Sequence, residues 1–195
     1  MSGAARLGIW LLTVPLVFVA MELWAALLHG RIWHGLLWRV HRSHHRLRRL
    51  GERLEANDAL SLLHAPIAIT LILYGCRGAE GIAREVAFGV GLGMTLFGIA
   101  YLVVHDGMVH GRLPVQGLLR FRYFARVRDA HQMHHRGRDV PPFGLFFGPL
   151  ELRQRPRTAS ESTLPAQRTD AEGPSPRSTS PNTSGRFRAV SRTNR

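Results

Sequence analysis

Histidines are the residues of this chain whose number and spacing point most clearly to chemistry. Eleven occur among the 195 residues, and ten of them form two copies of one pattern. Each copy has two histidines separated by four residues, followed downstream by a His-x2-His-His triplet. The ten are His29, His34, His41, His44, His45, His105, His110, His131, His134 and His135. A lone histidine on an apolar surface is usually structural, but ten in a doubled pattern predict metal binding. Neutral imidazole suits iron, zinc, copper and nickel.

The spacing also predicts local geometry. On a helix, positions i, i+3 and i+4 share one face, so each triplet is expected to aim three imidazoles at one point. Residues five apart lie about 140° apart on a regular helix. Each His-x4-His pair therefore requires a distorted turn, or its two members serve different metal ions. Glycines in and beside the pairs, Gly30, Gly35, Gly107 and Gly111, could supply the backbone freedom.

Long apolar segments must position these histidines. Residues 7–28, 59–75 and 86–104 are each apolar enough to be predicted as membrane-spanning helices. Residues 112–128 are basic and aromatic, as expected of a helix at the membrane surface. Residues 143–150 form a short apolar piece expected to dip into the interface. The predicted fold class is an all-α integral membrane bundle of three to four spans.

Arginines predict the topology and narrow the function. The formal charge is +13, and the arginines concentrate in residues 31–53 and 112–128, with few in residues 77–84. The positive-inside rule places the two rich segments, and all ten histidines, at the cytoplasmic face. Since the arginines flank apolar runs, they favour a membrane surface over nucleic acid as a partner. No zinc-finger cysteines or aromatic-basic RNA motif support nucleic-acid binding.

Composition divides the chain into two parts. Residues 1–150 are expected to form the membrane-embedded domain, and residues 151–195 a disordered basic tail rich in Ser, Thr, Pro and Arg. Cys76 is the only cysteine, which excludes an internal disulfide and a thiolate metal cluster.

The segments around the histidines resemble the bacterial beta-carotene 3-hydroxylases. The resemblance runs from about Met21 to Leu150 and is carried by His29-Gly-Arg-Ile-Trp-His34 through His44-His45, His105-Asp-Gly-Met-Val-His110, and Ala130-His131-Gln-Met-His134-His135. Glu55-Ala-Asn57-Asp58 and Phe143-Gly-Leu-Phe-Phe-Gly-Pro149 are similar as well. The wider superfamily of fatty acid hydroxylases and sterol desaturases shares only the histidine motifs.

The resemblance implies a specific activity. It implies two iron ions held by the ten histidines and the use of O2, with one oxygen atom inserted into a ring C–H bond and the other leaving as water. Beta-carotene, taken from the bilayer, would become beta-cryptoxanthin and then zeaxanthin. The electron donor would be a ferredoxin with its reductase, and the location the bacterial inner membrane.

Three acidic residues are candidates for orienting the imidazoles. Glu22 lies seven residues before His29 and hence on the same helix face. It either serves the site, as carboxylates inside spans often do, or pairs with an arginine or another polar group. Asp106 and Asp129 could accept hydrogen bonds from ligand imidazoles or balance nearby arginines, the second being favoured for Asp129.

Other residues have simpler interpretations. Asn57 and Asp58 are interpreted as a helix cap at the start of the second span. His64 lies outside both patterns and is interpreted as structural. Gly89, Gly91 and Gly93 are spaced like a nucleotide-binding loop but lie inside an apolar helix, where Gly89 and Gly93 are expected to allow close helix packing. No nicotinamide or flavin site is therefore predicted.

Several functions compete with hydroxylation of beta-carotene. A related oxygenase could act on a sterol, a fatty acyl chain or another carotenoid as hydroxylase, desaturase or ketolase, and product analysis would separate these. A non-catalytic membrane metal carrier would place histidines along a pore, whereas these are expected at one interface. A nucleic-acid-binding membrane protein would use the arginine-rich tail, which deletion of the tail would test.

Overall fold

The structure is a computed structural model that describes residues 1–46 and 54–154, and these residues are helical with no strand. Their α-helices are α1 (Gly3–Leu27), α2 (Trp38–His41), α3 (Asp58–Ser61), α4 (Ala65–Arg77), α5 (Ile82–Tyr101), α6 (Arg122–His134) and α7 (Gly148–Gln154). Two π-helices, η1 (Leu28–Leu36) and η2 (Leu102–Val109), continue α1 and α5, and η3 (Gln116–Arg120) is a short 3-10 helix.

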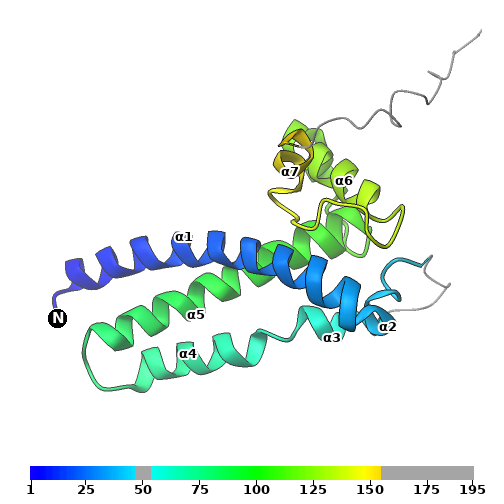
Figure 1. Ribbon diagram of the computed structural model, residues 1–195. Helices are drawn as coiled ribbons and strands as arrows, with labels where there is room; N and C mark the ends of the chain where they lie inside the picture. The colour runs from blue at the N-terminus through cyan, green and yellow to red at the C-terminus, as the bar shows by residue number, and fades with distance from the viewer. Residues whose placement is uncertain (47–53, 155–195) are drawn as a thin grey trace, which may run out of the picture. The chain divides into compact units, whose positions relative to one another are not determined.

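Three helical segments within the described residues are long and apolar enough to cross a membrane: Gly3–Leu36, Asp58–Arg77 and Ile82–Val109. They contain the three spans predicted from the sequence and extend each by several residues. In Figure 1, α1, α5 and α4 run side by side, with α5 between the other two. The all-helical membrane fold is therefore as predicted, with three spans.

Glycines set the close approach of the three spans. A side chain at Gly89 or Gly93 of α5 would collide with α1, at Thr13 and at the Val14 carbonyl oxygen respectively. A side chain at Gly91 would collide with the backbone of α4 at Ala68. Gly89 and Gly93 lie one helical turn apart, so they form the strip of small residues that lets α1 and α5 approach. The packing role expected for these two glycines is confirmed.

The second span is broken near its start. The chain leaves α3 at Ser61, turns through residues 62–64, and enters α4 at Ala65. Pro66 lies in the first turn of α4, where its missing N–H is tolerated. The helix of the membrane span is therefore interrupted on the side of the bundle that carries the histidines.

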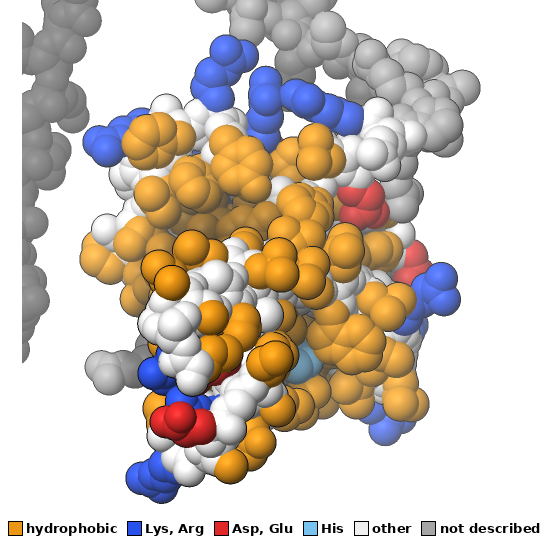
Figure 2. Space-filling model, turned by 90° about the vertical axis from the view of Figure 1, so that its left-hand side faces the viewer, with side chains coloured by type: hydrophobic (Ala, Val, Ile, Leu, Met, Phe, Trp, Pro, Cys, Tyr) orange, Lys and Arg blue, Asp and Glu red, His pale blue; other side chains and the backbone are white. Residues whose placement is uncertain are grey.

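The outer surface of the bundle is apolar. Leucines of α1 are strongly exposed, with Leu11 at 68% and Leu12 at 70% of their full accessibility. Figure 2 shows one end-on face covered largely by hydrophobic side chains, with arginines towards its edges. Such a surface is stable against lipid tails but not in water. The chain is therefore an integral membrane protein.

The chain after η2 packs around a small apolar cluster formed by Val104, Met108, Val127 and Leu145. The single surface helix predicted for residues 112–128 is divided. Gly111, with φ +67°, follows the end of η2, and Phe121, between η3 and α6, has an extended backbone with φ −88° and ψ 124° that interrupts the helix. Only η3 and α6 are helical there.

Helix α7 runs across the boundary expected at residue 150, and the division of the chain into two parts stays a prediction. Residues 151–154 of the expected tail form the last turn of this helix, and Glu151 accepts a hydrogen bond from the Phe143 N–H. The remainder of the expected tail, residues 155–195, lies outside the described residues, as do Arg48, Arg49 and Arg53 of the first arginine-rich segment.

Candidate metal centre

Each His-x4-His pair lies on a π-helix. His29 and His34 belong to η1, and His105 lies in η2 with His110 directly after it. The His110 N–H donates to the His105 carbonyl oxygen at 3.0 Å, a hydrogen bond between residues five apart. This bonding pattern brings residues i and i+5 to one face. Of the two alternatives left open by the sequence, the distorted turn is the one observed.

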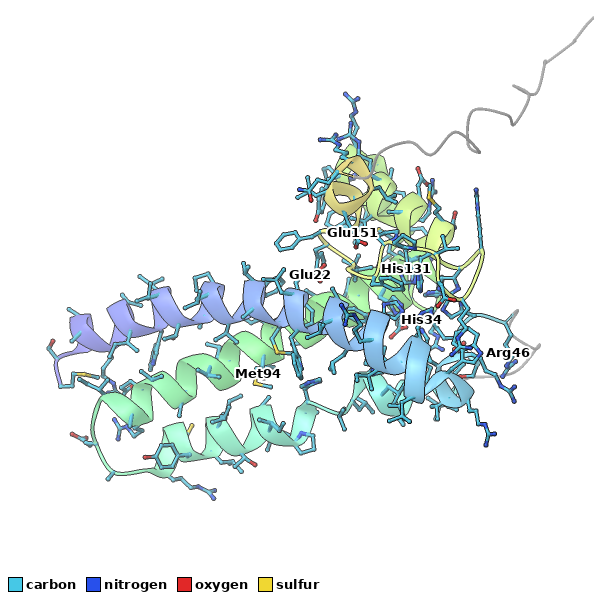
Figure 3. All side chains as sticks on the ribbon, viewed as in Figure 1. Glu22, His34, Arg46, Met94, His131 and Glu151 are labelled. Atoms are coloured by element: carbon cyan, nitrogen blue, oxygen red, sulfur yellow. The ribbon has the colours of Figure 1, made fainter. Side chains whose placement is uncertain are left out.

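The histidines converge into two groups at one end of the bundle. Figure 3 shows His34 and His131 there, with His34 near the end of the first span. Within each group, one candidate ligand atom from every histidine lies within 4.8 Å of the others. Group 1 contains His29, His34, His41, His45 and His134, and group 2 contains His44, His105, His110 and His131. His135 adjoins group 2, with its Nε2 atom 2.9 Å from that of His131.

The triplets do not aim three imidazoles at one point, so that prediction is wrong. His41 and His45 belong to group 1, but His44 belongs to group 2. Successive residues on a helix are about 100° apart, so i and i+4 differ by about 40° whereas i+3 and i+4 differ by about 100°. The second triplet is divided in the same way: His134 belongs to group 1 and His131 to group 2.

The two groups are related by the internal repeat. The first half of the pattern supplies four histidines to group 1 and sends His44 to group 2. The second half supplies group 2 and its neighbour His135, and sends His134 to group 1. Where the halves meet, the rings of His45 and His135 are stacked with centroids 4.4 Å apart. Each group is therefore completed by one crossing histidine.

The separation of the ring nitrogens fits a metal ion. The Nε2 atoms of His29 and His41 are 3.0 Å apart, and those of His34 and His134 are 3.2 Å apart. In group 2 the Nε2 atoms of His110 and His131 are 3.3 Å apart. Ligands about 2.1 Å from one ion and at right angles are about 3 Å from each other. The buried Nε2 atom of His44 has no hydrogen-bond partner among the described residues, as expected of an atom that binds a metal.

The Nδ1 atoms of several histidines donate hydrogen bonds to oxygen atoms. His29 Nδ1 donates to the Phe143 carbonyl oxygen at 2.8 Å, and His134 Nδ1 to that of Val140 at 2.6 Å. His41 Nδ1 donates to Asn57 Oδ1 at 2.7 Å. These bonds fix the tautomer in which Nε2 carries the lone pair, because the acceptors carry no proton to offer.

In group 2, carboxylates lie beside the Nδ1 atoms of two histidines. His105 Nδ1 donates to Asp106 Oδ1 at 2.9 Å, and His44 Nδ1 lies 3.6 Å from Glu55 Oε2. Arg112 bonds Glu55 at 2.8 Å and Asp58 at 2.8 Å, and lies 3.8 Å from Asp106. Of the two alternatives considered for Asp106, the hydrogen bond with an imidazole is observed, and Arg112 lies near it as well.

The interpretation of Asn57 and Asp58 as a helix cap is wrong for Asn57. Asn57 precedes α3, but its side chain makes no cap hydrogen bond and instead accepts from His41. Asp58 Oδ2 accepts the Glu55 N–H, and its other oxygen contacts Arg112. Sequence reasoning missed Glu55 and Arg112, although the resemblance around residues 55–58 marked the segment.

Burial keeps the imidazoles neutral. It lowers the pKa of His41 and of His134 to about 4, and that of His45 to about 3. Burial also holds the pKa of His44 and of His131 well below the usual range, with neighbouring histidines adding to the effect. These side chains are uncharged at neutral pH, so their lone pairs are available to a metal ion.

The remaining candidates lie outside the two groups. Glu22 is 1% exposed, and its Oε1 atom accepts the Phe147 N–H at 2.9 Å. Glu22 therefore bonds another polar group, the second of the alternatives considered for it. Asp129 is exposed and pairs with Arg128, as favoured from the sequence. His64 accepts a hydrogen bond from Trp24 Nε1 at 2.9 Å and stands apart from the groups.

The bundle contains a cavity of about 390 Å³. It lies between α1, α4 and α5, beside the break at residues 62–64, and is lined almost wholly by apolar side chains. Trp33, Tyr101 and Asp106 are among the residues that line it. The Trp33 ring contacts that of His29 in group 1, and the Tyr101 ring stacks on that of His105 in group 2 at 4.6 Å. Both groups are thus adjacent to one apolar cavity.

The site belongs to a known family. Residues 14–151 match the model of the fatty acid hydroxylase family, and this stretch contains all ten patterned histidines. The chain belongs to the fatty acid hydroxylase family. It is 37% identical to the beta-carotene hydroxylase of Pseudescherichia vulneris over 173 residues, which covers 84% of this chain and 94% of that protein.

Plant members of this family are also similar. The chain is 44% identical over 137 residues to beta-carotene hydroxylase 1 of Capsicum annuum and to beta-carotene 3-hydroxylase 1 of Arabidopsis thaliana, both chloroplastic. These matches cover 70% of this chain but 42% and 43% of the plant proteins, so the chain spans less than half their length. No solved structure matches the chain significantly.

Proposed function

We propose that the protein is an O2-dependent di-iron hydroxylase that converts beta-carotene to beta-cryptoxanthin and zeaxanthin. One observation carries the proposal: two groups of converging histidines adjoin an apolar cavity in a membrane bundle, through Trp33 and Tyr101. The names of the bacterial and plant relatives support the substrate and the reaction.

The ten patterned histidines are proposed as the ligands of two iron ions, one for each group. Imidazole nitrogens that are neutral, buried and about 3 Å apart are suited to a divalent transition metal. Iron bound there would supply the reduction of O2, with one oxygen atom entering the ring C–H bond and the other leaving as water.

The apolar cavity is proposed to hold one end ring of the carotenoid. A carotenoid is about as long as the hydrocarbon core is thick, about 30 Å. A cavity of about 390 Å³ therefore holds only part of it, and the rest must leave the bundle between helices. Trp33 and Tyr101 would confine the ring beside the histidines and exclude water.

The histidine end is proposed to face the cytoplasm of a bacterial cell, with the protein in the inner membrane. Exposed arginines, including Arg39, Arg42 and Arg136, lie near the histidines in the sequence, as the positive-inside rule requires of a cytoplasmic face. An acidic electron carrier such as a ferredoxin, with its reductase, would be attracted there and would supply two electrons for each hydroxylation.

The proposal is tested by expressing the full chain in bacteria that accumulate beta-carotene. Beta-cryptoxanthin and zeaxanthin are expected with oxygen and not without it. Chains with His41→Ala, His105→Ala or His135→Ala should accumulate to similar levels and convert no pigment. Unchanged beta-carotene beside a competent ferredoxin and reductase would refute the substrate, and a ketone product would refute the reaction while keeping the substrate.

A further inference from the structure

The two histidine groups differ in the charge of the oxygen atoms that lie beside their Nδ1 atoms. In group 1 the acceptors of the Nδ1 protons are neutral: the carbonyl oxygens of Phe143 and Val140 and the side-chain amide of Asn57. In group 2 the corresponding neighbours are carboxylates, Asp106 on His105 and Glu55 beside His44. The internal repeat thus makes the ligand sets similar and their surroundings unequal.

The two carboxylates beside group 2 are buried. Glu55 is 8% exposed and Asp106 is 7% exposed. The guanidinium of Arg112 contacts both, and it also bonds Asp58. The negative charges of Glu55 and Asp106 therefore lie beside the imidazoles of group 2, where solvent screens them weakly.

This difference acts on the ligands in two ways. A carboxylate that accepts the Nδ1 proton makes the imidazole a more basic ligand than a neutral acceptor does. The negative charge also attracts a cation at the nearby Nε2 atoms by Coulomb's law. Both effects favour an ion in group 2 over an ion in group 1, and both favour the more highly charged state of that ion.

We propose that the two metal positions are unequal, and that group 2 binds its ion more tightly and fills first. Asp106 is the positioning residue that makes the difference, assisted by Glu55, and Asn57 is its neutral counterpart in group 1. The inference rests on the metal-binding part of the proposed function and not on the substrate.

A matched pair of substitutions tests the role of charge without removing a hydrogen bond. Asp106→Asn keeps an acceptor oxygen near His105 and removes the negative charge of the acceptor side chain. Asn57→Asp keeps the acceptor for His41 and adds a negative charge to it. Metal-free full-length protein in detergent would be titrated with ⁵⁷Fe²⁺ without oxygen and followed by Mössbauer spectroscopy. His105→Ala and His29→Ala identify which spectrum belongs to which group, and Asp129→Asn, at an exposed carboxylate, is the control.

The unsubstituted chain is expected to show one spectrum at the first equivalent and a second, distinct one at the second equivalent. Asp106→Asn should weaken the tighter step by about 10- to 100-fold. Asn57→Asp should strengthen the weaker step, a gain that misfolding cannot produce. Two equivalents that fill together in the unsubstituted chain, or affinities that neither substitution changes, would overturn the inference.

Pigment conversion, measured separately, keeps this inference distinct from the proposed function. Ordered filling in a chain that leaves beta-carotene unchanged would refute the substrate and support the unequal positions. Simultaneous filling in a chain that makes zeaxanthin would refute the unequal positions and support the function.

Discussion

The spans and the histidine end of this molecule are held together by different forces. Along the spans, Gly89, Gly91 and Gly93 bring the helices into close contact, and most side chains face outward. At the histidine end the largest fully buried side chains include His41, His105 and His134, which are polar. The spans therefore depend on backbone packing in lipid, whereas the histidine end depends on hydrogen bonds and, under the proposed function, on a bound metal.

Metal removal is expected to give the largest difference between the histidine end and the spans. Chelation should loosen η1, α6 and residues 54–58, because the converging imidazoles would lose the ion that joins them. The packing of α4 against α5 should persist. Hydrogen exchange measured by mass spectrometry in detergent would show faster exchange at the histidine end alone. Equal loss of protection in α4 and α5 would mean that the two regions are not separable.

A second prediction concerns the glycine contact. Gly93→Leu should destabilise the bundle by about 1–3 kcal/mol, because its side chain would collide with Val14 and Val17. Gly8→Leu is the matched control, since a Cβ atom placed there meets no atom of another helix within 4 Å. Thermal unfolding in detergent should separate the two variants. Equal melting temperatures would contradict the packing role.

Glu22 connects the spans to the histidine end, and its substitution is expected to have a smaller effect. It belongs to α1 and bonds the Phe147 N–H of the loop that also provides the Phe143 carbonyl oxygen to His29. Glu22→Ala would leave a buried donor unpaired, at a cost of about 1–3 kcal/mol, whereas Glu22→Gln keeps an acceptor. Iron content after gentle purification should fall for Glu22→Ala and largely persist for Glu22→Gln. Full iron in both variants would refute the connection.

The smallest expected effect is at His64. Its bond to Trp24 links α4 to α1, and such bonds between membrane helices average about 0.6 kcal/mol. His64→Ala should retain iron and some carotenoid conversion, as measured by metal analysis and pigment chromatography. Loss of iron in this variant would show that His64 belongs to the metal site.

Much of this architecture could be predicted from the sequence because it depends on local patterns. Apolar length predicted the three spans, and the i, i+5 spacing of His29 and His34 required the distortion that the π-helix provides. The resemblance around the histidines named the family that the comparisons then showed.

The remaining features depend on contacts between distant segments. The crossing of His44 and His134 follows from the angle between helix positions and from where the opposite half lies, which spacing alone does not determine. Asn57 looks like a cap locally and becomes the acceptor of His41 only when the chain folds back. The cavity was not predicted, because it forms between three helices that are separate in the sequence.

The proposal that each histidine group holds one iron is tested most directly by measuring the iron content of the purified chain and of a His44→Ala variant. Two irons per unsubstituted chain are expected, since each histidine group is proposed to hold one. His44→Ala should retain about one, because it removes a ligand of group 2 while leaving group 1 complete. Active protein that contains zinc and no iron, or a His44→Ala chain that keeps both irons, would contradict it.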